Sequence, residues 1–145
     1  MTGKMHVMAD KVLVDTSAWI DFFRMKDPQL HKLVAMLLRE GRACGTGIIV
    51  LELIRGAKTT KELAVVSELF ETIEMLYQSR ATYVDAGKMG YELARKGHNL
   101  GVVDLLIAQL LLEKDLLLLT LDKHFEIIVK TFPLRLLPIP KTSLE

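Results

Sequence analysis

The stretch VLVDTSAWIDFF, residues 12–23, places a carboxylate between two segments that both favour burial. The apolar, β-branched run before Asp15 predicts a short buried strand over residues 11–15. The apolar and aromatic residues after it predict a helix that Thr16 or Ser17 can cap. A buried carboxylate is costly unless it is paired, protonated or bound to a metal. The position of Asp15 therefore has to be explained by the rest of the chain.

The bulk composition is that of a globular domain. The chain has 145 residues, of which 50% are hydrophobic and 26% charged, and its net charge is +1. A chain of this length can bury a sizeable core without disulfides. Its single cysteine, Cys44, fits a reducing compartment and is interpreted as a small buried residue. We therefore expect one domain over residues 1–145, with its core at about 11–138.

The sequence contains no pattern typical of a signal peptide or a membrane span. The first residues lack an apolar run of the required length. The most apolar stretch, residues 105–120, is broken by Gln109 and by the charged triplet at 113–115. A membrane-spanning helix needs about 20 apolar residues in succession. We therefore expect a cytoplasmic protein that has no membrane partner.

Short apolar segments alternate with helical patterns along the chain. Such alternation is typical of βαβ units, in which a parallel sheet carries helices on both faces. The predicted fold class is α/β, a three-layer α/β/α sandwich with a short parallel sheet. Its ligand site should lie outside the carboxyl ends of the strands. The expected strands cover residues 11–15, 43–46, 75–77, 116–119 and 134–137.

Four carboxylates lie in apolar surroundings that contain few cations. Asp15 and Asp122 follow the two most apolar strands, Glu52 lies within IIVLELI, and Asp104 lies in the first turn of GVVDLLIAQL. Like charges that share a site repel and raise one another's pKa. A divalent cation removes this conflict, and oxygen ligands without histidine or cysteine favour a hard ion, Mg²⁺ or Mn²⁺.

Each of these acids also has a purely structural interpretation. Asp15 can cap a helix, and Asp104 and Asp122 can interact with helix dipoles, which contributes about 0.3–1 kcal/mol each. Glu52 lies in the middle of its expected helix, where it has no capping role. A purely structural role for all four acids would require four independent coincidences.

Four segments, in this order, resemble the successive motifs of the PIN domain: VLVDTSAWIDFF, LELIRG, VVDLLIAQL and LLLLTLDKHF. The resemblance covers nearly the whole chain, and the first two segments are most similar to the VapC toxins of VapBC toxin–antitoxin pairs. It implies an Mg²⁺- or Mn²⁺-dependent endoribonuclease that leaves 5′-phosphate and 3′-hydroxyl ends. The catalytic, metal-binding acids that it implies are Asp15, Glu52, Asp104 and Asp122, with Thr16, Ser17 and Thr120 as small polar residues beside the metal.

The resemblance also implies three partners. They are an RNA substrate, a second copy of the chain in a homodimer, and a VapB-type antitoxin whose tail covers the acidic groove. RNA phosphates require cations, and the candidates for this contact are Arg55, Lys123 and His124. The ordinary interpretation of each is a solvated surface charge.

Other functions fit parts of the pattern. A PIN-domain nuclease that is not a toxin would carry the same acids, whereas a PIN-like binding module would not need all four. A receiver-type phosphoacceptor domain needs an acidic pair before its first helix and an aspartate after a middle strand. A haloacid-dehalogenase-type phosphatase needs a second aspartate where this chain has Ser17.

Overall fold

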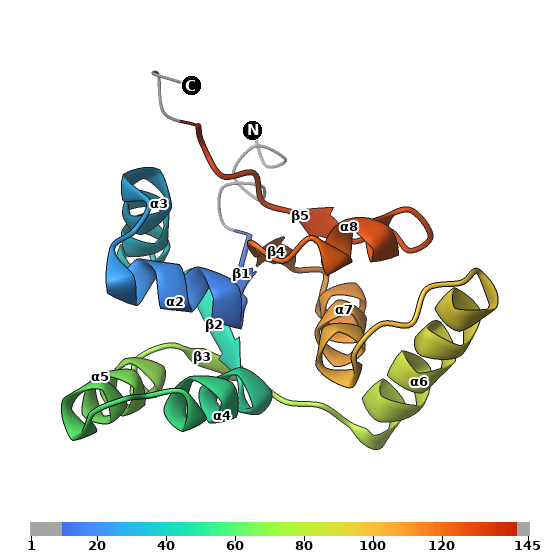
Figure 1. Ribbon diagram of the computed structural model, residues 1–145, viewed down its shortest axis with the longest axis horizontal. Helices are drawn as coiled ribbons and strands as arrows, with labels where there is room; N and C mark the ends of the chain where they lie inside the picture. The colour runs from blue at the N-terminus through green and yellow to red at the C-terminus, as the bar shows by residue number, and fades with distance from the viewer. Residues whose placement is uncertain (1–9, 142–145) are drawn as a thin grey trace.

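The centre of the fold is a parallel sheet of five strands with helices on both faces (Figure 1). The computed structural model describes residues 10–141. The sheet has the spatial order β3-β2-β1-β4-β5, and every neighbouring pair is parallel. Its strands are β1 (Val12–Val14), β2 (Ala43–Thr46), β3 (Glu74–Leu76), β4 (Leu117–Leu119) and β5 (Arg135–Leu136).

The strand order tests one of the alternative functions, the receiver-type phosphoacceptor domain. Receiver-type domains have the order 2-1-3-4-5, which differs from the order observed here. The predicted α/β fold class is therefore confirmed, and the receiver alternative is excluded.

The helices form the two outer layers. In Figure 1, α2 and α3 lie on one side of the sheet, whereas α6 and α7 lie on the other. The helices are α2 (Thr16–Arg24), α3 (Pro28–Arg39), α4 (Gly47–Arg55), α5 (Thr60–Glu71), α6 (Arg80–Arg95), α7 (Val102–Lys114) and α8 (His124–Val129). Within residues 10–141, none of them is long and apolar enough to cross a membrane.

The start of α3 follows directly from local sequence. The carboxylate of Asp27 accepts hydrogen bonds from the amides of Gln29 and Leu30, and Pro28 lies in the first turn. Proline fits there because its missing N–H would have no partner within the helix. Both features are local, because aspartate is a common N-cap residue and proline a common first-turn residue.

The start of α2 differs from the prediction. The helix begins at Thr16 with Asp15 in the N-cap position, and no side chain caps it. The expectation that Thr16 or Ser17 caps this helix is therefore wrong. The Thr16 hydroxyl bonds to Glu52 instead, and the Ser17 hydroxyl bonds to Asp15 and to the segment after β4, as described below.

The core is built around β1 and α7. Each residue of β1 is fully buried, which explains its unbroken apolar sequence. On α7, buried side chains occur on most faces, as predicted for a central helix. Gly90 allows α6 to approach α7 closely, because a Cβ atom at Gly90 would lie 2.6 Å from Leu105 Cδ1. Cys44 is buried in β2, and burial raises the pKa of its thiol to about 11.

Gly45 in β2 lies so close to α5 that a side chain does not fit. A Cβ atom there would lie 2.7 Å from Phe70 Cε1 and 3.2 Å from Ile73 Cδ1. We expect Gly45→Ala to lower the free energy of unfolding by about 1–3 kcal/mol, because the aromatic ring has to move. Urea denaturation measures this change. Gly47→Ala is the matched control, since its Cβ would meet open space; equal stability of both variants would contradict the packing described here.

Candidate functional site

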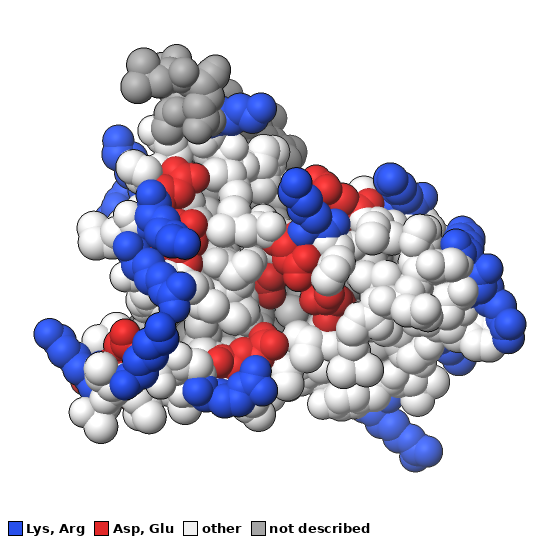
Figure 2. All heavy atoms as spheres, in the orientation of Figure 1, with Lys and Arg blue, Asp and Glu red and all other residues white. Residues whose placement is uncertain are grey.

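Three acidic residues meet where the strands end. In the register of β1 and β4, Val14 lies opposite Leu119, so the residues after these strands, Asp15 and Asp122 among them, leave the sheet at the same edge. The first turn of α7 brings Asp104 to Asp122. Figure 2 shows acidic side chains gathered around a hollow in the middle of this face, with basic side chains farther out.

Asp15 is the most buried carboxylate of the site, with 6% of its surface exposed. Its Oδ2 accepts hydrogen bonds from Thr120 Oγ1 at 2.8 Å and from Ser17 Oγ at 3.1 Å. Burial raises the pKa of Asp15; the hydrogen bonds from Thr120, the Thr16 amide and Ser17 oppose this increase, and repulsion from Asp122 adds to it. The surrounding groups therefore orient the carboxylate without neutralising it.

Ser17 and Thr120 join the first motif to the last. Ser17 Oγ lies 3.3 Å from Thr120 Oγ1 and accepts a hydrogen bond from the Leu121 amide at 3.0 Å. Thr120 Oγ1 also accepts a hydrogen bond from the Asp122 amide at 2.9 Å. These bonds fix the segment that carries Asp122 relative to the end of β1. They explain why small hydroxyl residues occupy these positions.

Glu52 is connected to this group through Thr16. From the middle of α4, Glu52 Oε1 accepts a hydrogen bond from Thr16 Oγ1 at 2.6 Å. Because Thr16 follows Asp15 in the chain, the bond sets the distance between α4 and the first acid. Arg55, one turn further along α4, is exposed, and among residues 10–141 it forms no ion pair with Glu52.

His124 lies between Asp104 and Asp122. Its Nδ1 is 3.2 Å from Asp104 Oδ2 and 3.3 Å from Asp122 Oδ1. Burial raises the pKa of Asp104, repulsion from Asp122 adds to the increase, and the hydrogen bond with His124 opposes it. One oxygen of each aspartate and a ring nitrogen of His124 lie within 4.8 Å of one another, a group that could hold a metal ion. The structure thus places an imidazole nitrogen beside the carboxylate oxygens expected from the sequence.

From the sequence, His124 is expected only as a candidate RNA contact. One local feature of the sequence points to the place of His124 in the cluster. It follows Asp122 by two residues, and α8 begins at His124. The contact with Asp104 spans 20 residues and depends on how α7 and α8 pack. The third candidate cation, Lys123, is exposed and makes no ion pair within the described residues.

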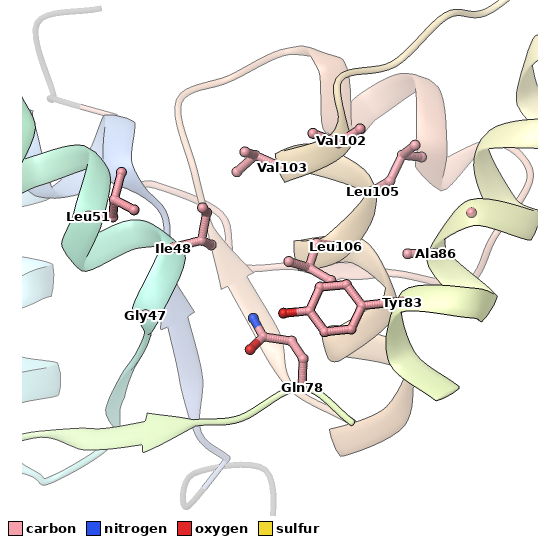
Figure 3. A pocket seen from close by; sticks show the side chains of 11 residues that line it. Gly47, Ile48, Leu51, Gln78, Tyr83, Ala86, Val102, Val103, Leu105 and Leu106 are labelled. Atoms are coloured by element: carbon pink, nitrogen blue, oxygen red, sulfur yellow. The ribbon is translucent and has the colours of Figure 1, made fainter. Parts of the chain in front are cut away.

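An apolar pocket of about 560 Å³ adjoins the acidic group (Figure 3). Residues of α4, α6 and α7 line it, and Gln78 and Tyr83 place an amide and a hydroxyl near each other at its edge. On α7, Val102 and Val103 belong to the pocket and the next residue is Asp104. The first turn of α7 therefore carries both residues that line the pocket and Asp104 of the acidic site.

The PIN domain family matches residues 12–130 of this chain. The chain belongs to the PIN domain family. This membership confirms the resemblance found in the sequence.

Within this family the chain is of the VapC type. It is 32% identical over 102 residues to a tRNA(fMet)-specific endonuclease VapC of Salmonella typhimurium, which covers 68% of this chain and 76% of that protein. It is 30% identical over 124 residues to ribonuclease VapC1 of Methanocaldococcus jannaschii, with 85% of each chain covered. The crystal structure of DNA-bound VapBC from Salmonella typhimurium superposes with a TM-score of 0.73 at 28% identity, covering 87% of this chain and 96% of that one.

The raised pKa of Asp15 means that its ionisation opposes folding. The folded chain holds a proton on this carboxyl more readily than the unfolded chain, so the free energy of unfolding falls as pH rises through the raised pKa. We expect Asp15→Asn to be more stable than the parent near pH 7 without metal. The gain should shrink as pH falls below about 4, where the Asp15 carboxyl becomes protonated in the unfolded chain as well as in the folded one.

Thermal unfolding in the presence of EDTA over this pH range measures the effect. The control is Asp115→Asn, at an exposed residue before β4 whose positive φ asparagine tolerates. It should bring no such gain. A variant at Asp15 that is less stable than the parent at every pH would contradict the repulsion assigned to this site.

Proposed function

We propose that this chain is a divalent-cation-dependent endoribonuclease and the toxin of a VapBC-type pair. The observation that carries the proposal is the meeting of Asp15, Asp104 and Asp122 at one edge of a PIN-domain sheet. Burial and mutual repulsion raise the pKa of Asp15 and of Asp104. Two similar proteins are named as an endonuclease and a ribonuclease of the VapC type, which supports the same activity here.

The residues of the site fit a divalent cation, because closely spaced carboxylates need a positive charge among them. Asp15, Asp104 and Asp122 would hold the ion, which we propose to be Mg²⁺ or Mn²⁺. A cation bound there supplies charge that stabilises the scissile phosphate and lowers the pKa of a water molecule. The hydroxyls of Ser17 and Thr120 orient the Asp15 carboxylate toward this cation.

The remaining residues position the substrate and the fourth acid. Glu52, held by Thr16 at 2.6 Å, is kept on the α4 side of the site, where it can orient water or help to hold cations. Arg55 lies on α4 with Glu52, and Lys123 lies beside Asp122 in the connection between β4 and α8. Both are exposed charges, and we assign to them the contacts with RNA phosphates. The products would carry 5′-phosphate and 3′-hydroxyl ends.

Substitution of Asp15 tests the activity. We expect Asp15→Asn to remain folded and to lose cleavage of RNA in Mg²⁺ or Mn²⁺ by at least about 100-fold, because charge stabilisation at the phosphate is lost. The similar Salmonella protein is named for tRNA(fMet), so a transfer RNA is the first substrate to test. Asp115→Asn should cleave like the parent. Equal cleavage by Asp15→Asn and the parent would refute the site.

We also propose that a VapB-type antitoxin binds the groove between α2, α4 and α5. A similar chain forms a complex named VapBC. The groove, about 290 Å³, is largely apolar, carries the cations Arg24 and Lys61, and includes Glu52. A segment bound there would therefore reach the acidic site from one side.

The homodimer expected from the sequence is proposed for the face around the apolar pocket. Leu51, Tyr83 and Val102 are 55%, 58% and 81% exposed although each lines this pocket. Exposed apolar side chains that cluster in this way are typical of a protein interface. A second copy packed there would remove them from water.

Charged substitutions at this face test the dimer. We expect Leu51→Glu and Val102→Glu to shift the chain from dimer to monomer in analytical ultracentrifugation, because a buried unpaired charge opposes association. Val129→Glu on α8, at a similarly apolar but separate surface position, should leave the mass unchanged. A parent chain that is monomeric at all concentrations would contradict this part of the proposal.

A further inference from the structure

The imidazole of His124 is spaced from two carboxylates as a metal ligand would be. Its Nδ1 lies 3.2 Å from Asp104 Oδ2 and 3.3 Å from Asp122 Oδ1. Neighbouring ligands of a six-coordinate cation with bonds of about 2.1–2.3 Å are about 3.0–3.3 Å apart. The nitrogen therefore lies at the distance from each oxygen that two neighbouring ligands of one cation would have.

The backbone holds this histidine in place from both sides. The His124 amide donates a hydrogen bond to Asp122 Oδ1 at 2.9 Å, and the Asp122 amide is bonded to Thr120 Oγ1. The next residue, Phe125, is fully buried and anchors the start of α8. His124 itself is 63% exposed at its side chain, so an incoming ion can reach Nδ1 without a rearrangement of the core.

We propose that His124 Nδ1 is a direct ligand of the divalent cation, alongside Asp104 and Asp122, and that it makes the site prefer Mn²⁺ to Mg²⁺. This inference rests on the proposed metal-dependent nuclease site. Imidazole nitrogen suits transition metals, whereas Mg²⁺ prefers oxygen ligands and releases its water reluctantly. A site with carboxylates alone would not discriminate between the two ions to the same extent.

A histidine that serves only as a counter-charge to the two aspartates leads to the opposite expectation. Such a side chain would occupy the place of the cation and compete with it. Its removal would then strengthen the binding of Mg²⁺ and Mn²⁺ alike. The two roles can therefore be separated by the direction and the ion-dependence of the change in affinity.

Calorimetric titration of the metal-stripped full-length chain with MnCl₂ and with MgCl₂ provides the first test. It is run near pH 8, because histidine binds metals as neutral imidazole. We expect His124→Ala to weaken Mn²⁺ binding at least about tenfold and to change Mg²⁺ binding much less. His124→Asp, which replaces the nitrogen by oxygen, should shift the preference back toward Mg²⁺.

The matched control is His98→Ala. His98 is exposed in the connection between α6 and α7, and within residues 10–141 its side chain makes no hydrogen bond or ion pair with the acids of the site. This variant should bind both ions like the parent. A loss of Mn²⁺ affinity that is equal in His98→Ala and His124→Ala would overturn the assignment.

Pulsed electron paramagnetic resonance of the Mn²⁺-loaded chain gives a readout that a structural role would not affect. A directly bound imidazole produces ¹⁴N modulation, which should be present in the parent and in His98→Ala and absent in His124→Ala. A parent that binds Mn²⁺ without this modulation, or a His124→Ala variant that binds both ions more tightly, would refute the role of His124 alone. A parent that binds neither ion would refute the proposed function itself.

Discussion

The burial of mutually repelling carboxylates at one edge of the sheet is the constraint to which the surrounding structure is fitted. Burial raises the pKa of Asp15 and Asp104, and their interaction with Asp122 raises both further. The groups that oppose this are two hydroxyls, an amide and an imidazole, and within the described chain neither lysine nor arginine pairs with these acids. The hydroxyl and amide donors fix the direction of the Asp15 carboxylate but leave its charge available to a cation. The site thus favours ligand binding at the expense of stability.

The core supplies the rigidity that this arrangement needs. Repelling carboxylates would move apart on a flexible loop, but here β1 is fully buried and delivers Asp15 to a fixed point. The contacts that close the core, such as Gly45 against Phe70 and Gly90 against Leu105, leave no room for the layers to shift. A site that is held by well-packed strands and helices can keep unfavourable charges at short distances.

Sequence reasoning succeeded where the controlling interactions are local, and it failed where they are tertiary. Short apolar runs predicted the strands, and the start of α3 depends only on the adjacent Asp27 and Pro28. Thr16 was assigned a capping role on local preference, yet its hydroxyl bonds to Glu52, 36 residues away. His124 could be recognised as a neighbour of Asp122 but not of Asp104, because that contact requires α7 and α8 to be packed first.

Helix α4 connects the acidic site with both surfaces that flank it. Ile49 and Leu53 are buried in the core, Ile48 and Leu51 line the apolar pocket, and Glu52 lines the groove on the other side. This division explains why the sequence around Glu52 is apolar in every direction, since each face of the helix packs against or adjoins an apolar surface. Residue 48 is three and four positions from residues 51 and 52, so it neighbours each of them on the helix surface and the two lined surfaces adjoin there. A partner that displaces α4 at either surface would therefore move the Glu52 carboxylate relative to Thr16 and Asp15.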